Sequence, residues 1–79
     1  MNERERAVFG AILGEKKVAV IEYLVQNADE NGFINLKIDE ICVALNISKP
    51  TTINTFKILA KAKALTRIKN GVYRLNTLE

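Results

Sequence analysis

The sequence is poor in the residues from which catalytic and metal sites are built. Histidine and tryptophan are absent, and the 79 residues include a single cysteine, Cys42. Without histidine the chain lacks the commonest general base and zinc ligand, and Ser-His or Cys-His pairs are excluded. One thiol cannot form a disulfide within the chain. We therefore expect no catalytic residue, no metal and no cofactor, and we interpret Cys42 as a small buried side chain.

Long apolar segments are also missing. No segment approaches the roughly 20 apolar residues that a membrane-spanning helix needs. The first six residues carry both signs of charge and no apolar stretch, so no secretory signal is predicted. The length fits one domain, residues 1–79, in which 1–14 form an N-terminal extension and 78–79 resemble a cloning remnant. We expect this domain to be cytoplasmic.

Acidic residues are nearly absent from the second half of the chain. Residues 1–40 hold five Lys or Arg and eight acids, a net charge of −3. Residues 41–79 hold seven Lys or Arg and one acid, Glu79, a net charge of +6. This division suggests a basic surface that meets a polyanion. A solvated basic face with no partner explains the charge equally well.

The apolar spacing and the turn residues predict a mainly helical α+β domain. Helices are expected at 3–13, 15–28, 38–45 and 48–63, a short extended segment at 33–36, and a hairpin at 65–75. Gly14 is placed to end the first helix. Lys37 is a poor N-cap for the helix predicted at 38–45, because its side chain cannot accept a backbone hydrogen bond. The acidic residues in the first turn of that helix partly compensate, since they interact favourably with the positive end of the helix dipole. In the second helix, Val18, Ile21, Leu24, Val25 and Ala28 repeat at helical spacing.

The helix predicted at 48–63 has two distinct sides. Ser48 is a good N-cap, and Pro50 sits in the first turn, where its missing N–H costs nothing. Ile53 flanks the inner side and is interpreted as core. At about 100° per residue, one side carries Thr52, Phe56, Leu59 and Lys63, and the opposite side carries Pro50, Asn54, Lys57 and Lys61.

The last element is predicted to be a two-stranded hairpin. Asn70-Gly71 is a strong signal for a type I′ turn, which requires positive φ at both central residues. A two-residue loop then pairs Lys69 with Val72. The same register pairs Ile68 with Tyr73, Arg67 with Arg74 and Thr66 with Leu75. Strand alternation places Ile68 and Tyr73 on an apolar face, and Arg67, Lys69 and Arg74 on a cationic one.

This order of elements is that of a winged helix-turn-helix domain: three core helices, a short strand and a hairpin wing, preceded here by a short N-terminal helix. The stretch 41–51, Ile-Cys-Val-Ala-Leu-Asn-Ile-Ser-Lys-Pro-Thr, resembles a bacterial pattern in which "Leu-Ala-x-x-Leu-x-Ile-Ser" leads into a recognition helix. The segment 47–75 resembles plasmid replication proteins of the RepL type and centromere-binding adaptors of tubulin-type partition systems. MarR-like regulators share the layout. The chain departs from these families at Lys37 and in its short wing.

The resemblance implies a double-stranded DNA-binding protein that acts in transcription, plasmid or phage replication, or partition. Asn54 would bond an adenine edge and Lys57 a guanine or phosphate in the major groove, while the wing would lie on the backbone. The alternative, for the helix face and for the wing alike, is an exposed face whose charges only keep the protein soluble. The residues assigned to DNA contact are Ser48, Lys49, Pro50, Thr51, Asn54, Lys57, Lys61, Arg67, Lys69 and Arg74.

A homodimer is expected, because the apolar residues near the N-terminus exceed what a small three-helix core needs. A two-fold dimer would match an inverted-repeat site. The alternative is that the first helix packs only on its own domain. The residues assigned to the dimer interface are Val8, Phe9, Ile12, Leu13, Val20 and Tyr23.

A second class of function stays open at this point. Winged helices also serve as protein–protein docking modules, in which case the basic half would need an acidic partner protein, in a replication or partition assembly for example. An enzyme is not expected, because the acids at 29–30 and 39–40 lie in a turn and at a helix start, where capping explains them.

Overall fold

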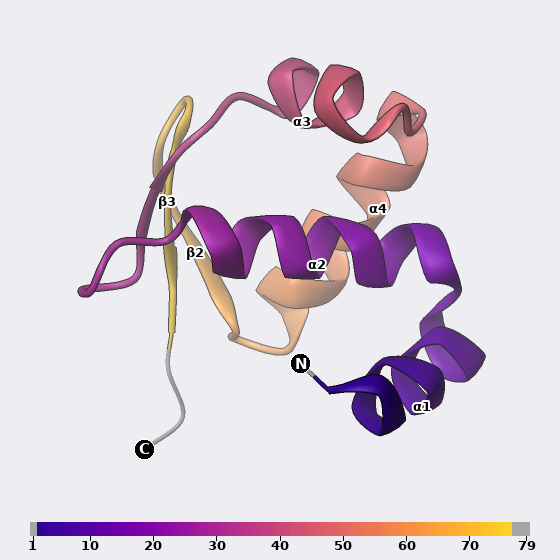
Figure 1. Cartoon of the computed structure of the whole chain (residues 1–79). Helices are drawn as coiled ribbons and strands as arrows, with labels where there is room; N and C mark the ends of the chain where they lie inside the picture. The colour runs from indigo at the N-terminus through magenta and orange to yellow at the C-terminus, as the bar shows by residue number, and fades with distance from the viewer. Residues whose placement is uncertain (1, 77–79) are drawn as a thin grey trace.

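A computed structural model describes residues 2–76, which fold into helices packed against a small sheet (Figure 1). The helices and the sheet confirm the predicted α+β winged-helix class. None of the helices in this part of the chain has the length and apolar character that crossing a membrane requires. The elements are α1 (Glu3–Leu13), α2 (Glu15–Asn27), β1 (Phe33–Asn35), α3 (Ile38–Leu45), α4 (Lys49–Lys61), β2 (Leu65–Lys69) and β3 (Val72–Leu75).

The core lies where α2, α3 and α4 meet the sheet. Phe56 of α4 and Tyr73 of β3 pack edge to face, with ring centroids 4.9 Å apart. The inner side of α2 differs from the prediction: Val20 is fully buried, whereas Val25 is 57% exposed. The reason is that α2 packs against α3, α4 and β1 together, which turns residues 20 and 24 inward. The core residues are Val20, Leu24, Ile34, Ile41, Ile47, Phe56, Leu59, Leu65 and Tyr73.

The turn between α3 and α4 is built from local hydrogen bonds. Asn46 adopts a left-handed conformation, φ 53°, which ends α3. The N–H of Ile47 then donates to the Cys42 carbonyl at 3.1 Å, and the Ile47 side chain enters the core. Asparagine tolerates this conformation better than most residues, which explains a sharp turn without glycine. Ser48 follows as the N-cap of α4, as predicted, with its hydroxyl accepting from the Thr51 N–H.

The weak cap at the start of α3 is compensated from inside the helix. Lys37 occupies the N-cap position, and its N–H donates to the Glu40 carboxylate at 2.8 Å. A carboxylate three residues into a helix also meets the positive end of the helix dipole. The boundary of α3 therefore agrees with the prediction although no side chain at position 37 accepts a hydrogen bond.

The helix α4 ends at Lys61, two residues before the predicted end at Lys63. Lys63 lies in the left-handed region with φ 62°, and the N–H of Ala64 donates to the Leu59 carbonyl at 2.8 Å. The Asn76 side-chain amide donates to the Lys63 carbonyl at 2.9 Å. These bonds satisfy the carbonyl end of the helix and direct the chain into β2.

The sheet has the order β1-β3-β2, and all of its pairs are antiparallel. Lys69 pairs with Val72, as predicted, but a bulge between Arg67 and Lys69 shifts the rest of the register. Arg67 pairs with Tyr73, Thr66 with Arg74, and Leu65 with Leu75. The predicted register beyond Lys69 was therefore wrong.

The physical reason for the shifted register is the burial of Leu65. The predicted pairing would turn Thr66 inward, whereas the observed pairing buries Leu65, 5% exposed, and leaves Thr66 in solvent. The bulge absorbs the one-residue difference between the turn and the buried end of β2. The turn itself has positive φ at Gly71 but not at Asn70, so the predicted type I′ turn is also corrected.

Candidate nucleic-acid interface

The outer strip of α4, made by Pro50, Asn54, Lys57 and Lys61, is exposed as predicted. On the opposite side the buried threonines satisfy their hydroxyl groups within the helix. The Thr52 hydroxyl donates to the Ser48 carbonyl at 3.1 Å, and that of Thr55 to the Thr51 carbonyl at 2.8 Å. Since Phe56 and Leu59 are also buried on this side, the rotation of α4 is fixed. Packing therefore presents an amide and two ammonium groups outward.

The N-terminal end of α4 carries two hydroxyl groups and a lysine. The Ser48 and Thr51 hydroxyl oxygens lie 2.9 Å apart in a hydrogen bond. The Lys49 ammonium lies 3.3 Å from the Asp39 carboxylate in the first turn of α3. Both partners of this ion pair are well exposed, so it contributes little stability. The end of the helix thus offers hydroxyl groups of the kind that bind phosphate, while Pro50 has no N–H and the Thr51 N–H is already bonded to the Ser48 hydroxyl.

Arg67 of β2 and Lys57 of α4 line one groove. The groove has a volume of about 210 Å³, and its floor is formed by apolar side chains of α3, α4 and the sheet. Because Arg67 pairs with Tyr73, it lies on the sheet face that packs on the helices. Lys57 and Arg67 therefore line the same groove, one from α4 and one from β2. The other residues that line it are Ile38, Ile53, Phe56, Ala60, Leu65 and Tyr73.

Arg74 occupies the opposite face of the sheet. Its guanidinium lies 5.6 Å from the centre of the Phe33 ring, and its Nε donates to the Asn31 carbonyl at 3.4 Å. Lys69 pairs with Val72, two residues before Arg74, and shares that outer face. The predicted single face of Arg67, Lys69 and Arg74 is therefore corrected: the bulge separates Arg67 from the other two. DNA contact by these residues stays a prediction.

Lys37 was not among the predicted site residues, yet it lies against the turn of the wing. A Cβ placed on Gly71 would be 3.4 Å from the Lys37 Cγ. The two residues are distant in sequence, and the antiparallel pairing of β1 with β3 brings them together. No local sequence pattern reveals this contact, since it depends on which strand lies next to the hairpin.

Cys42 is half-buried, and its thiol lies 3.4 Å from the Thr52 hydroxyl, with which it forms a hydrogen bond. The pair joins α3 to α4. Cys42 was predicted to be buried, and the structure leaves it partly exposed. Ile53, interpreted as core, is only partly buried and lines the groove between α4 and the wing.

The predicted dimer residues divide into two groups. Val8, Phe9 and Ile12 are exposed on α1, with Leu13 half-buried beside them. Tyr23 is half-buried against the core. Val20 is fully buried inside its own domain, so it has no surface to offer a partner chain, and its assignment to the interface is corrected.

The model of a protein family, Firmicute plasmid replication protein (RepL), matches residues 9–78. The chain belongs to this RepL family. The match covers all three helices of the core and the complete sheet, so it includes every element of the candidate interface. Membership in RepL supports a DNA-binding role in plasmid replication. Partition and transcriptional regulation, the other processes predicted from the sequence, stay predictions.

The fold of this RepL protein also occurs in a solved structure. The chain is similar to a protein described as the reduced (FeII) CO-sensing protein from R. rubrum, with a TM-score of 0.74 and 18% identity. The similarity covers 92% of this chain and 38% of that protein, so the chain spans well under half of its length. At this identity the likeness shows a shared fold. No curated protein matches the sequence.

Proposed function

We propose that this RepL protein binds double-stranded DNA of its plasmid with sequence preference, as a homodimer in the cytoplasm, and has no catalytic activity of its own. The observation that carries the proposal is the outer strip of α4, which is exposed and free of carboxylates while the opposite side is buried. Helices presented in this way by helix-turn-helix domains enter the major groove. Family membership supplies the process, plasmid replication.

In this proposal each part of the interface has a separate task. Asn54 and Lys57 read base edges, an amide favouring adenine and an ammonium favouring guanine. Ser48 and Thr51 bind phosphate at the helix N-terminus, and Lys61 extends the contact along the backbone. Arg67 holds the phosphate backbone from the β2 side of the groove. No carboxylate lies between residues 41 and 76 of the sequence, and the Asp39 carboxylate, 3.3 Å from the Lys49 ammonium, lies beside the start of α4.

The turn of the wing adds a second set of cations. Lys69 precedes the turn, and Lys37 lies against Gly71 within it. Together they would clamp the backbone beyond the reach of α4. Such contacts give affinity without sequence preference, so binding should weaken steeply as salt rises.

A docking function is the second candidate, and the groove between α4 and the wing favours it. Most of its lining residues are apolar, and Lys57 and Arg67 are its two cations. An acidic peptide with one bulky apolar side chain would satisfy both features. Such a partner would occupy the surface proposed for DNA, so it would compete with DNA binding.

Substitution of the strip tests the proposal. Asn54→Ala and Lys57→Ala should each weaken binding to the preferred duplex by about 1–3 kcal/mol, measured by fluorescence anisotropy, with the fold intact by circular dichroism. Lys16→Ala, which removes an exposed lysine at the start of α2, is the matched control and should bind normally. If both strip variants bind like the control, α4 does not read DNA.

A further inference from the structure

The small sheet has one face that the helices do not cover. Its inner face packs on α2 and α4, and the helices lie on one side of the sheet (Figure 1). We call the opposite side the outer face of the sheet. Strand pairing and alternation place six residues on it, in two rows that cross the strands. The first row is Phe33, Arg74 and Thr66, and the second, nearer the turn of the wing, is Asn35, Val72 and Lys69.

The first row contains a stacked pair of planar groups. Phe33 is 36% exposed, and the Arg74 guanidinium lies over its ring, 5.6 Å from the ring centre. The Asn31 carbonyl, which accepts from the Arg74 Nε at 3.4 Å, holds the guanidinium from a second direction. The Arg74 side chain is still exposed. A ring and a guanidinium held in this way offer a surface on which a further planar group can stack.

The outer face of the sheet carries only positive charge. Arg74 and Lys69 are its two charged residues, and both are exposed. The ion pairs formed within residues 2–76 involve neither of them. Asn35 and Thr66 add an exposed amide and an exposed hydroxyl. The face therefore combines a stacking surface with cations and hydrogen-bonding groups, which suits a polyanion that has planar groups of its own.

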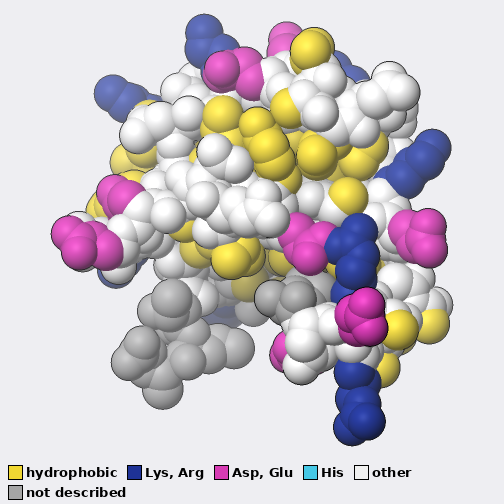
Figure 2. Space-filling model, viewed as in Figure 1, with side chains coloured by type: hydrophobic (Ala, Val, Ile, Leu, Met, Phe, Trp, Pro, Cys, Tyr) yellow, Lys and Arg dark blue, Asp and Glu magenta, His cyan; other side chains and the backbone are white. Residues whose placement is uncertain are grey.

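Acidic side chains border the outer face at its two ends. Asp29 and Glu30 lie in the turn before β1, and Figure 2 shows acidic side chains over this turn. The Asp29 carboxylate accepts the N–H of Phe33 at 2.9 Å. After β1, the Glu40 carboxylate accepts the N–H of Lys37 at 2.8 Å. Both of these carboxylates bond the backbone at the ends of β1, so the cations between them remain open to a ligand.

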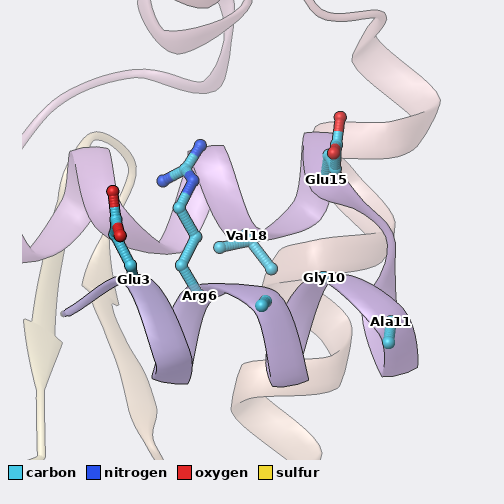
Figure 3. Close-up of a pocket in the computed structure, with 7 residues that line it drawn as sticks. Glu3, Arg6, Gly10, Ala11, Glu15 and Val18 are labelled. Carbon is cyan, nitrogen blue, oxygen red and sulfur yellow. The ribbon is translucent and has the colours of Figure 1, made fainter.

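The hollow between α1 and α2 has a different charge. It has a volume of about 460 Å³, and its lining includes Glu3, Arg6, Glu15 and Val18 (Figure 3). Arg6 forms an ion pair with Glu22, which leaves the two glutamates of the lining to set the charge of the hollow. The hollow would therefore repel the polyanion that the outer face of the sheet attracts.

We propose that the outer face of the sheet binds single-stranded DNA. An unpaired base stacks on the Phe33–Arg74 pair, and Lys69 holds the phosphate backbone near the turn of the wing. The Asn35 amide and the Thr66 hydroxyl lie within the same two rows and bond base edges. In a duplex each base is stacked between its neighbours and offers no free face, so the stacked pair selects an unpaired strand. Sheet faces that display aromatic side chains and cations bind single strands in this way.

This contact is separate from the duplex contact proposed for α4. The duplex would lie against α4 and the groove lined by Arg67, which is on the inner side of the sheet. The chain belongs to a family of plasmid replication proteins, and replication separates the two strands of a duplex. The occupant that fits both the face and this process is therefore DNA rather than RNA.

A fluorescent reporter on the outer face tests the stacking directly. The chain contains no tryptophan, so Phe33→Trp introduces a single indole, whose emission a stacked base quenches. An oligothymidine of about 15 nucleotides should quench it with saturation. Phe9→Trp is the matched reporter on α1, because Phe9 is 42% exposed and Phe33 is 36% exposed; it should not be quenched. A duplex of the same length should leave the emission of Phe33→Trp unchanged.

A second variant separates stacking from charge. Arg74→Lys keeps the positive charge but removes the planar group, so its affinity for the oligothymidine, measured by fluorescence anisotropy, should fall about tenfold. Arg4→Lys makes the same chemical change at an exposed arginine of α1 and should bind like the wild-type chain. Circular dichroism of each variant checks that the fold is intact.

Several results would overturn the inference. Among them are equal quenching of Phe33→Trp and Phe9→Trp, quenching of Phe33→Trp by the duplex, and an Arg74→Lys chain that binds like Arg4→Lys. Tighter binding of an oligouridine RNA than of the oligothymidine would overturn the assignment to DNA. Quenching by the oligothymidine in a chain that binds no duplex would support this inference and contradict the proposed function. Duplex binding without any quenching would do the reverse.

Discussion

Replacing Arg67 tests whether the groove between α4 and the wing meets the phosphate backbone. Each phosphate contact contributes about 0.9 to the slope of log K against log salt on duplex DNA. Arg67 lines this groove, so Arg67→Ala should lower the slope by about 0.9. The loss should be similar on preferred and random duplexes, because phosphate carries no sequence information.

Arg74→Ala is the internal comparison, since it removes the same charge from the other face of the sheet. Its guanidinium is held by Phe33 and the Asn31 carbonyl, so its loss should cost about 0.5–1 kcal/mol of folding stability and leave the slope nearly unchanged. Titrations by anisotropy at several salt concentrations measure the slope. Equal slopes for wild type and Arg67→Ala would refute the placement of the backbone in this groove. A larger change in Arg74→Ala than in Arg67→Ala would show that DNA meets the outer face instead.

Two further predictions concern the fold that holds the interface. Gly32→Ala should destabilise the domain by about 1–3 kcal/mol in urea unfolding, because φ is +87° and the new Cβ would lie 2.5 Å from the Leu75 carbonyl oxygen. Gly10→Ala, whose nearest neighbour would be the Glu15 Cγ at 3.9 Å, should stabilise by about 0.5–1 kcal/mol; equal effects at the two positions would be inconsistent with this account. Thr52→Val should cost about 1 kcal/mol by the same assay, since it removes the hydroxyl that bonds Cys42 and the Ser48 carbonyl. An unchanged midpoint would show that this contact between α3 and α4 adds no stability.

The sequence predicted the helix-turn-helix because its signals are local. Ser48 and Pro50 mark the start of α4, and the spacing of Phe56 and Leu59 sets its buried side. These features depend on residues within one or two turns of each other, where propensity and capping act directly. The same helical spacing predicted that the outer strip of α4 is exposed, and the structure confirms this exposure.

The wing was predicted less well because its register depends on the core. The Asn70-Gly71 turn correctly pairs Lys69 with Val72, but the burial of Leu65 requires a bulge that the turn sequence does not encode. One residue of slip moved Arg67 to the α4 side of the sheet and left Arg74 on the other. For the same reason the burial of Val20 and the contact of Lys37 with the turn appear only in the assembled domain.

Selection from a pool of random duplexes by the purified chain, followed by sequencing, tests the role of α4 most directly. The account predicts an enriched inverted repeat with half-sites about one helical turn, roughly 34 Å, apart. It also predicts that Asn54→Ala loses the preference at one position of each half-site. Recovery of no motif by the wild-type chain, or of an identical motif by Asn54→Ala and Lys57→Ala, would contradict it.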